Sequence, residues 1–160
     1  MNRKTDINNF CAFVSVDKPK LRRFVSLLDT ELPRGLRAPQ GTLSVAIFND
    51  ADLAKIHLDF MRNPAPTDVI TFEGDESDPD DAGEICASAE TAFKNAPQFG
   101  NTPSRELSLY IAHGYLHLAG VDDIAEEDAE KMRAAEAAAL EILDKHFKTP
   151  IFKYDDKKIW

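Results

Sequence analysis

Two histidines four residues apart, His113 and His117, are the side chains around which a metal site could form. Apolar residues recur at helical spacing over residues 104–118, so we expect a largely buried helix on which residues four apart share a face. Gly120 can adopt positive φ, which would end the helix and turn the chain back. Asp123 would then bring a carboxylate to the two imidazoles. Two imidazoles and one carboxylate, with a fourth position open, form the outline of a catalytic zinc site.

The histidine pair has two other interpretations. Histidines at this spacing are a weak motif alone, and both rings could pack against the core with their nitrogens bonded to backbone carbonyls. The offsets also match the zinc peptidase pattern H-E-x-x-H-x-x-G-x-x-H, whose glutamate is the general base. Gly114 stands in place of that glutamate here. A peptidase would therefore lack its proton acceptor, whereas a metal site could remain.

This stretch resembles the signature H-G-x-L-H-L-x-G-Y-D-H of the YbeY family, bacterial single-strand-specific metallo-endoribonucleases of ribosomal RNA maturation. Val121 stands where the family has tyrosine, and Asp123 stands where it has its third histidine. A carboxylate oxygen binds zinc at about 2.0–2.2 Å, much as a histidine nitrogen does. The resemblance therefore implies ligands at His113, His117 and Asp123, with Asp122 as the alternative to Asp123. The matching positions are His113, Gly114, Leu116, His117, Leu118, Gly120 and Asp122.

Three earlier blocks are similar to successive YbeY blocks and occur in the same order: 49–61, 66–72 and 83–85. With the metal signature, the resemblance covers roughly residues 43–125. It implies an α+β fold in which helices cover a four-stranded mixed sheet, with the metal site on a helix and the loop after it. We expect a single domain over 1–160, with a core of about 10–147 and a tail at 148–160.

Many family members carry a functional arginine just before the Pro-Thr-Asp block. When Thr67 and Asp68 are in register, Met61 takes that place and Arg62 follows it. The resemblance thus suggests Arg62 as a catalytic residue that reaches the site through a small local shift. The alternative is an arginine solvated at a helix end. Thr67 and Asp68 are expected to fix the strand entry through backbone hydrogen bonds.

The composition is that of an ordinary globular domain, with 43% hydrophobic and 29% charged residues among 160. No apolar run approaches membrane-spanning length. The net charge of −9 argues against RNA binding through a broad basic surface. The densest basic cluster is either a solvated helix face or a phosphate-contacting patch, and comprises Lys18, Lys20, Arg22 and Arg23.

Local patterns predict the elements that must position the site. Strands are expected over 10–16, 41–48, 68–72 and 83–88. Beside the histidine helix, further helices are expected over 17–32, 52–61, 89–96 and about 123–147. An acidic loop occupies 73–82, and the apolar residues of the tail either dock on the body or are mobile. Cys11 and Cys86 are expected to be small buried strand residues in a reducing cytoplasm, with a disulfide between them as the alternative.

The resemblance implies a metal-dependent endoribonuclease with one Zn²⁺ ion that matures the 3′ end of 16S ribosomal RNA and serves ribosome quality control in the cytoplasm. The implied partners are single-stranded ribosomal RNA and the small subunit or its assembly factors, without DNA or membrane. The proton acceptor is either the metal hydroxide or Asp122; alternatively, the RNA 2′-hydroxyl acts as the nucleophile. Two other functions remain open: a zinc peptidase-like hydrolase, and a catalytically weak ribosome-assembly factor.

Overall fold

The centre of the molecule is a four-stranded mixed sheet, which confirms the expected α+β class. The computed structural model describes residues 3–61 and 67–159. The strand order is β1-β3-β5-β4, and β1, β3 and β5 are parallel, whereas β4 runs antiparallel to β5 at the edge. The strands are β1 (Thr5–Asn9), β3 (Thr42–Phe48), β4 (Val69–Glu73) and β5 (Asp81–Ser88).

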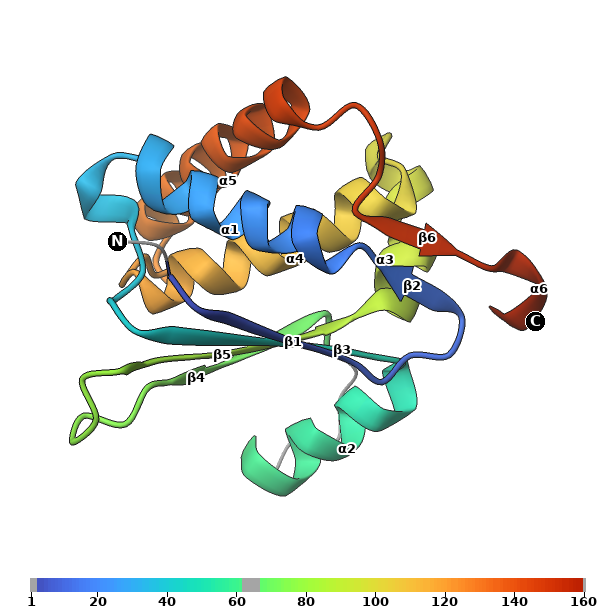
Figure 1. Cartoon of the computed structure of the whole chain (residues 1–160), viewed down its shortest axis with the longest axis horizontal. Coiled ribbons are helices and arrows are strands. Elements are labelled where there is room, and N and C mark those ends of the chain that lie inside the picture. Colours follow the sequence, from blue (N-terminus) through green and yellow to red (C-terminus); the bar gives the residue numbers. More distant parts are fainter. Residues whose placement is uncertain (1–2, 62–66, 160) are drawn as a thin grey trace.

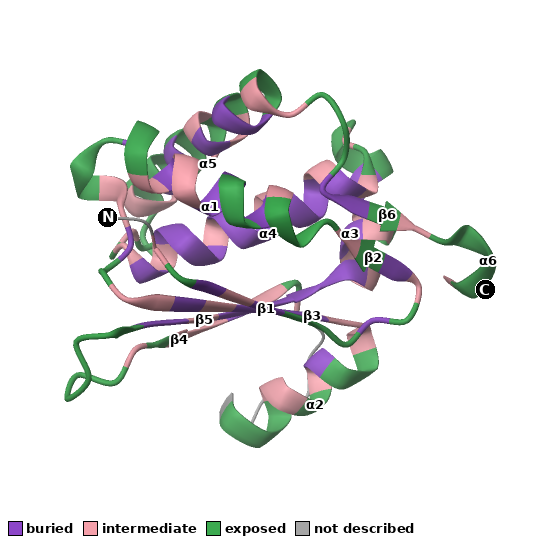
Figure 2. Ribbon diagram, in the orientation of Figure 1, coloured by how far each residue is buried: buried purple, intermediate pink, exposed green. Residues whose placement is uncertain are grey.

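Helices cover the two faces of this sheet unequally (Figure 1). Helices α1, α3, α4 and α5 lie on one face and α2 lies on the other, and α4 lies between α5 and the sheet. The buried residues line the interfaces between these layers, while the outer faces are exposed (Figure 2). The helices are α1 (Lys18–Glu31), α2 (Asp50–Met61), α3 (Ala89–Asn95), α4 (Pro103–Leu118) and α5 (Glu126–His146). Among the described residues, no helix has the length and apolar character needed to span a bilayer.

The first strand lies elsewhere than expected. The single strand expected over 10–16 is wrong, because the sheet strand is β1 and a separate short strand, β2 (Val14–Val16), follows it. In β1 only Thr5 and Ile7 are buried. An edge strand needs few apolar side chains, since one of its sides faces solvent, so its polar sequence gave little sign of a strand.

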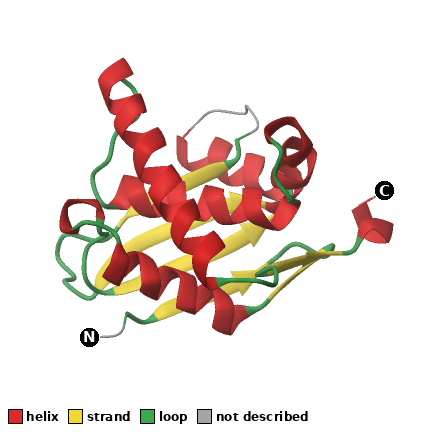
Figure 3. Ribbon diagram, turned by 90° about the horizontal axis from the view of Figure 1, so that it is seen from above, coloured by secondary structure: helices red, strands yellow, loops and turns green. Residues whose placement is uncertain are grey.

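The C-terminal segment packs against the body. β6 (Phe152–Tyr154) pairs antiparallel with β2, and α6 (Asp156–Ile159) follows it. Seen from above, this two-stranded ribbon lies beside the main sheet (Figure 3). Ile151 and Phe152 are buried, so these two residues dock rather than move freely. Single 3₁₀ turns at Arg34–Leu36 and Ala96–Phe99 complete the fold.

Side chains cap the first turns of α1 and α2. The Asp17 carboxylate accepts a hydrogen bond from the Lys20 amide at 3.1 Å, and the Asn49 side chain accepts one from Asp52 at 2.8 Å. Such caps satisfy amide groups that have no partner within the helix. The observed helices begin and end within a few residues of the expected boundaries.

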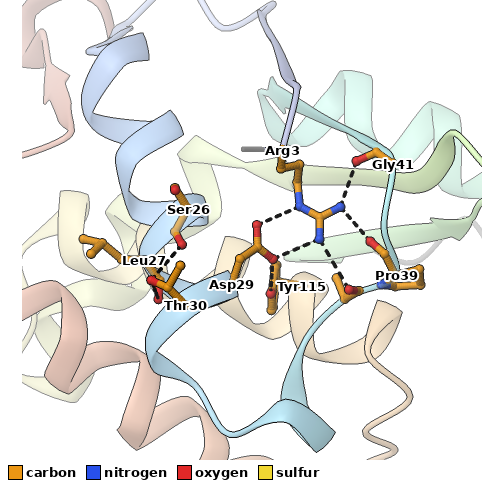
Figure 4. A network of polar contacts seen from close by, with 9 residues as sticks. Arg3, Ser26, Leu27, Asp29, Thr30, Pro39, Gly41 and Tyr115 are labelled. Atoms are coloured by element: carbon orange, nitrogen blue, oxygen red, sulfur yellow. Dashed lines mark hydrogen bonds and ion pairs between the residues drawn. The ribbon is translucent and has the colours of Figure 1, made fainter. Parts of the chain in front are cut away.

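A buried ion pair fixes the face of α4 that points away from solvent (Figure 4). The Arg3 guanidinium bonds both carboxylate oxygens of Asp29 on α1 at 2.9 Å, and the Tyr115 hydroxyl of α4 donates to Asp29 at 2.5 Å. The side chain of Arg3 is only 5% exposed. Its remaining N–H groups donate to the carbonyls of Ala38, Pro39 and Gly41. Every donor of the guanidinium is thus satisfied, as a buried arginine requires.

Candidate metal centre

Helix α4 presents both histidines at one margin of the core. The Thr102 hydroxyl caps its first turn by accepting a hydrogen bond from the Arg105 amide at 3.2 Å. The inner face of the helix is completely buried at Leu107, Ile111 and Tyr115. His113 and His117 share the adjoining, half-buried face, and their Nε2 atoms lie 2.9 Å apart.

The loop after α4 brings the third side chain back to this face. Gly120 has φ of 94°, a conformation that side chains disfavour, and its amide donates to the His117 carbonyl at 3.0 Å. The Val121 amide then donates to the Leu116 carbonyl at 3.0 Å. The chain therefore reverses tightly and places Asp123 Oδ2 at 3.4 Å from His113 Nε2 and 3.5 Å from His117 Nε2.

The three side chains have the geometry of a metal site. Donor atoms of tetrahedral zinc, bound at about 2.0–2.2 Å, lie about 3.3–3.6 Å from one another. Both contacts of Asp123 match that separation, while the shorter contact between the rings is a hydrogen bond that an ion would replace. Two imidazoles and one carboxylate are also ligands that zinc accepts. His113, His117 and Asp123 could therefore hold a metal ion.

Asp122 points away from this cluster. Its Oδ1 accepts hydrogen bonds from the amides of Asp123 at 2.7 Å and Ile124 at 3.2 Å. It also lines a different cavity, between the loop and α5. Of the two aspartates that the sequence offered, the structure brings Asp123 to the histidines.

A fourth residue, which the sequence analysis missed, contacts the cluster from α5. The Glu136 Oε2 atom lies 3.1 Å from His113 Nδ1. Burial lowers the pKa of His113, but the hydrogen bond to Glu136 and the negative charges of Glu136 and Asp123 outweigh it, so that the pKa is raised. Glu136 lies 23 residues beyond His113, and no sequence motif joins the two.

Beside the cluster lies a pocket of about 300 Å³ at the free edge of β4. Thr67 Oγ1 donates to the Val69 carbonyl at 3.4 Å, and the Asp68 carboxylate accepts from the Val69 amide at 2.8 Å. Both thus make the backbone contacts expected at the strand entry. Arg62, the expected catalytic arginine, lies outside the described residues. The pocket is lined by His57, Thr67, Asp68, Val69, Ile70, Thr71, His113, His117 and Asp123.

The basic cluster on α1 lies at the end of the molecule occupied by β2 and β6, whereas the histidines lie near the C-terminal end of α4 (Figure 1). Lys20 contacts Asp17 and Thr149, Arg22 donates to the Thr5 carbonyl at 3.3 Å, and Arg23 lies 5.1 Å above the Phe147 ring. These three cations thus make structural contacts with neighbouring elements.

Gly114 lets α4 approach the sheet closely. A Cβ atom there would lie 2.7 Å from Ile85 Cγ2 and 3.0 Å from Thr71 Cγ2. Position 114 therefore faces the sheet, and the structure has no room there for the glutamate of the peptidase pattern.

We expect Gly114→Ala to lower the free energy of unfolding by about 1–3 kcal/mol, because the added methyl group overpacks a buried contact. Urea denaturation of the metal-free protein measures this change. Gly35→Ala is the matched control, since a Cβ at Gly35 meets nothing within 4 Å; its effect should stay within about 0.5 kcal/mol. Equal stability of Gly114→Ala and wild type would contradict the close approach.

Comparison with known proteins agrees with this fold and shows the family of the chain. The model of the endoribonuclease YbeY family matches residues 6–144. An endoribonuclease YbeY from Rhodopirellula baltica is 41% identical over 106 residues, which are 65% of this chain and 55% of that protein. One from Carboxydothermus hydrogenoformans is 30% identical over 140 residues, 87% of this chain and 96% of that protein. The solution structure of TM1509 from Thermotoga maritima has the same fold, with a TM-score of 0.54 at 23% identity over 88% of this chain and 92% of that one. Because the family model spans most of the sequence, this chain belongs to the endoribonuclease YbeY family.

Proposed function

We propose that this protein is a metal-dependent endoribonuclease that cleaves single-stranded RNA with one zinc ion held by His113, His117 and Asp123. The observation that carries the proposal is the convergence of these three donor groups beside an edge pocket, in a chain of an endoribonuclease family.

The residues of the site have distinct tasks. His113 and His117 present their Nε2 atoms on one face of a rigid helix, and Asp123 supplies a negative charge that offsets part of the charge of the ion. A zinc ion held by these residues would polarise a phosphoryl oxygen and acidify bound water. Asp122 is occupied by amide groups of its own loop, which favours the RNA 2′-hydroxyl or the metal-activated water over Asp122 as a participant in proton transfer.

Electrostatics favour an ion as the main attraction for the phosphate. The described residues that line the pocket include Asp68 and Asp123 but neither lysine nor arginine. RNA phosphates are normally bound by cationic side chains, so the ion would supply the positive charge that the lysine and arginine side chains of other RNA-binding sites provide. Arg62 is proposed as a further catalytic cation, on the basis of the family pattern alone.

The cellular role is part of the same proposal. Family resemblance supports maturation of the 3′ end of 16S ribosomal RNA and ribosome quality control in the cytoplasm, with the small subunit or its assembly factors as partners. A strongly acidic protein with net charge −9 would bind naked RNA weakly, so docking on a ribosomal particle would help to place the substrate.

The experiment combines metal analysis with a cleavage assay. The purified protein is expected to contain about one zinc per chain, to lose cleavage of unstructured RNA after chelation, and to recover it when zinc is restored. A duplex of the same sequence should remain intact. Full cleavage by metal-free protein would contradict the proposal. Cleavage of casein without cleavage of RNA would indicate a peptidase, and binding to ribosomal particles without turnover would indicate an assembly factor.

A further inference from the structure

Glu136 lies in the stripe of α5 that packs against the body of the protein. The buried residues of this helix are Met132, Ala135, Ala139, Ile142 and Leu143. Glu136 follows Met132 by four positions and precedes Ala139 by three, so it belongs to the same face. Its side chain is 20% exposed, whereas Glu126, Glu127, Glu130 and Glu141 of the same helix are exposed.

A carboxylate in such a position needs a partner, because burying an unpaired charge is costly. The contact that meets this need is the one between Glu136 Oε2 and His113 Nδ1, at 3.1 Å. An ionised carboxylate can only accept hydrogen bonds, so the proton lies on Nδ1 and the imidazole donates it.

This hydrogen bond determines what the other side of the ring can do. In a neutral imidazole with its proton on Nδ1, Nε2 carries the lone pair. That Nε2 atom is the one that faces Asp123 and His117. Glu136 therefore selects the tautomer that can bind a metal through Nε2 and holds the ring in the required orientation. Hydrogen bonds of this kind also make the imidazole a stronger donor to the metal.

We propose that Glu136 is a positioning residue of the metal centre, which acts on the ion through His113; this inference rests on the metal-dependent function proposed above. Glu136 contacts a ligand ring rather than substrate or the reacting phosphate. Its effect should therefore appear first in metal affinity and only through it in cleavage.

Three substitutions separate this role from simple packing. Glu136→Leu fills the space with an apolar side chain, Glu136→Ala leaves it empty, and Glu136→Gln retains a hydrogen-bond acceptor without the charge. Glu141→Ala is the matched control, since Glu141 is an exposed glutamate of the same helix. Zinc affinity of the full chain is measured by competition with a chelator, and the absorption spectrum of the cobalt-loaded protein reports ligand geometry. The melting temperature of the metal-free protein reports stability.

We expect Glu136→Leu and Glu136→Ala to weaken zinc binding about 10–100-fold, the usual effect of losing such an outer hydrogen bond. Glu136→Gln should fall between these variants and wild type, and Glu141→Ala should match wild type. The metal-free Glu136→Leu protein should melt at or above the wild-type temperature, because an apolar residue can replace a buried charge without loss of stability. Weaker metal binding by an equally stable protein distinguishes positioning from a structural role.

Two other outcomes would overturn the inference in different ways. Wild-type zinc affinity and an unchanged cobalt spectrum in both Glu136→Leu and Glu136→Ala would remove the role of Glu136 and leave the metal-dependent function standing. A wild-type protein that binds no zinc would overturn the proposed function and the role of Glu136 together.

Discussion

The His117→Ala protein is expected to lose bound zinc and RNA cleavage together. The substitution removes one of three donor atoms and leaves His113 and Asp123, too few ligands for a stable zinc site. The zinc affinity should fall by more than the factor of about 10–100 that is expected when an outer hydrogen bond is removed. Because His117 is only half-buried, the fold should survive, and circular dichroism would verify this. Metal content and the rate of single-stranded RNA cleavage are the two measurements.

His146→Ala serves as the control for His117→Ala. His146 lies in the last turn of α5 with its Nε2 atom 2.5 Å from Glu31 on α1, so it contributes to the contact between these helices. Its replacement should reduce stability and leave the zinc content unchanged. If His117→Ala retained zinc and cleaved RNA at the wild-type rate, the proposed ligand set would be wrong.

The Arg3→Ala protein is expected to lose about 3–5 kcal/mol of unfolding free energy, as is usual when one partner of a buried ion pair is removed. The Asp29 carboxylate, 21% exposed, would keep only the Tyr115 hydroxyl of the two partners shown in Figure 4. Three carbonyl groups would lose their donor as well. Urea denaturation of the metal-free protein measures the change, and the zinc content of the protein that remains folded should be unaltered.

Two further variants serve as references for the stability loss expected of Arg3→Ala. Arg34→Ala removes an exposed arginine and should change stability by no more than about 0.5 kcal/mol. Tyr115→Phe removes one hydrogen bond, leaves the ion pair intact and should cost about 1–2 kcal/mol. A change below about 1 kcal/mol for Arg3→Ala, a typical cost for a single hydrogen bond, would show that the pair contributes little.

The candidate site could be predicted largely from the sequence, because most of its geometry is local. His113 and His117 lie close together because they are one helical turn apart. Asp123 reaches them because the chain reverses tightly at Gly120. The choice between Asp122 and Asp123 needed the structure, since both follow the same glycine and only the direction of each side chain separates them.

The features that the sequence did not indicate depend on tertiary packing. Glu136 reaches His113 because α5 packs on α4, and residues on the inner face of a helix are recognisable only by apolar character, which glutamate lacks. The strand β1 was missed for a related reason, because an edge strand buries one side chain in two or fewer. The mixed sheet was predicted from the family resemblance, whereas the local patterns placed its first strand wrongly.

The link between Asp29 and Tyr115 joins positions 86 residues apart in the sequence. During protein synthesis Arg3 and Asp29 leave the ribosome long before that tyrosine is made, so the helix with the histidines is secured only late in translation. Contacts of such long range slow folding, since a large loop must close before they form. A nascent chain paused before Tyr115 would therefore expose an incomplete core, the kind of species that chaperones bind.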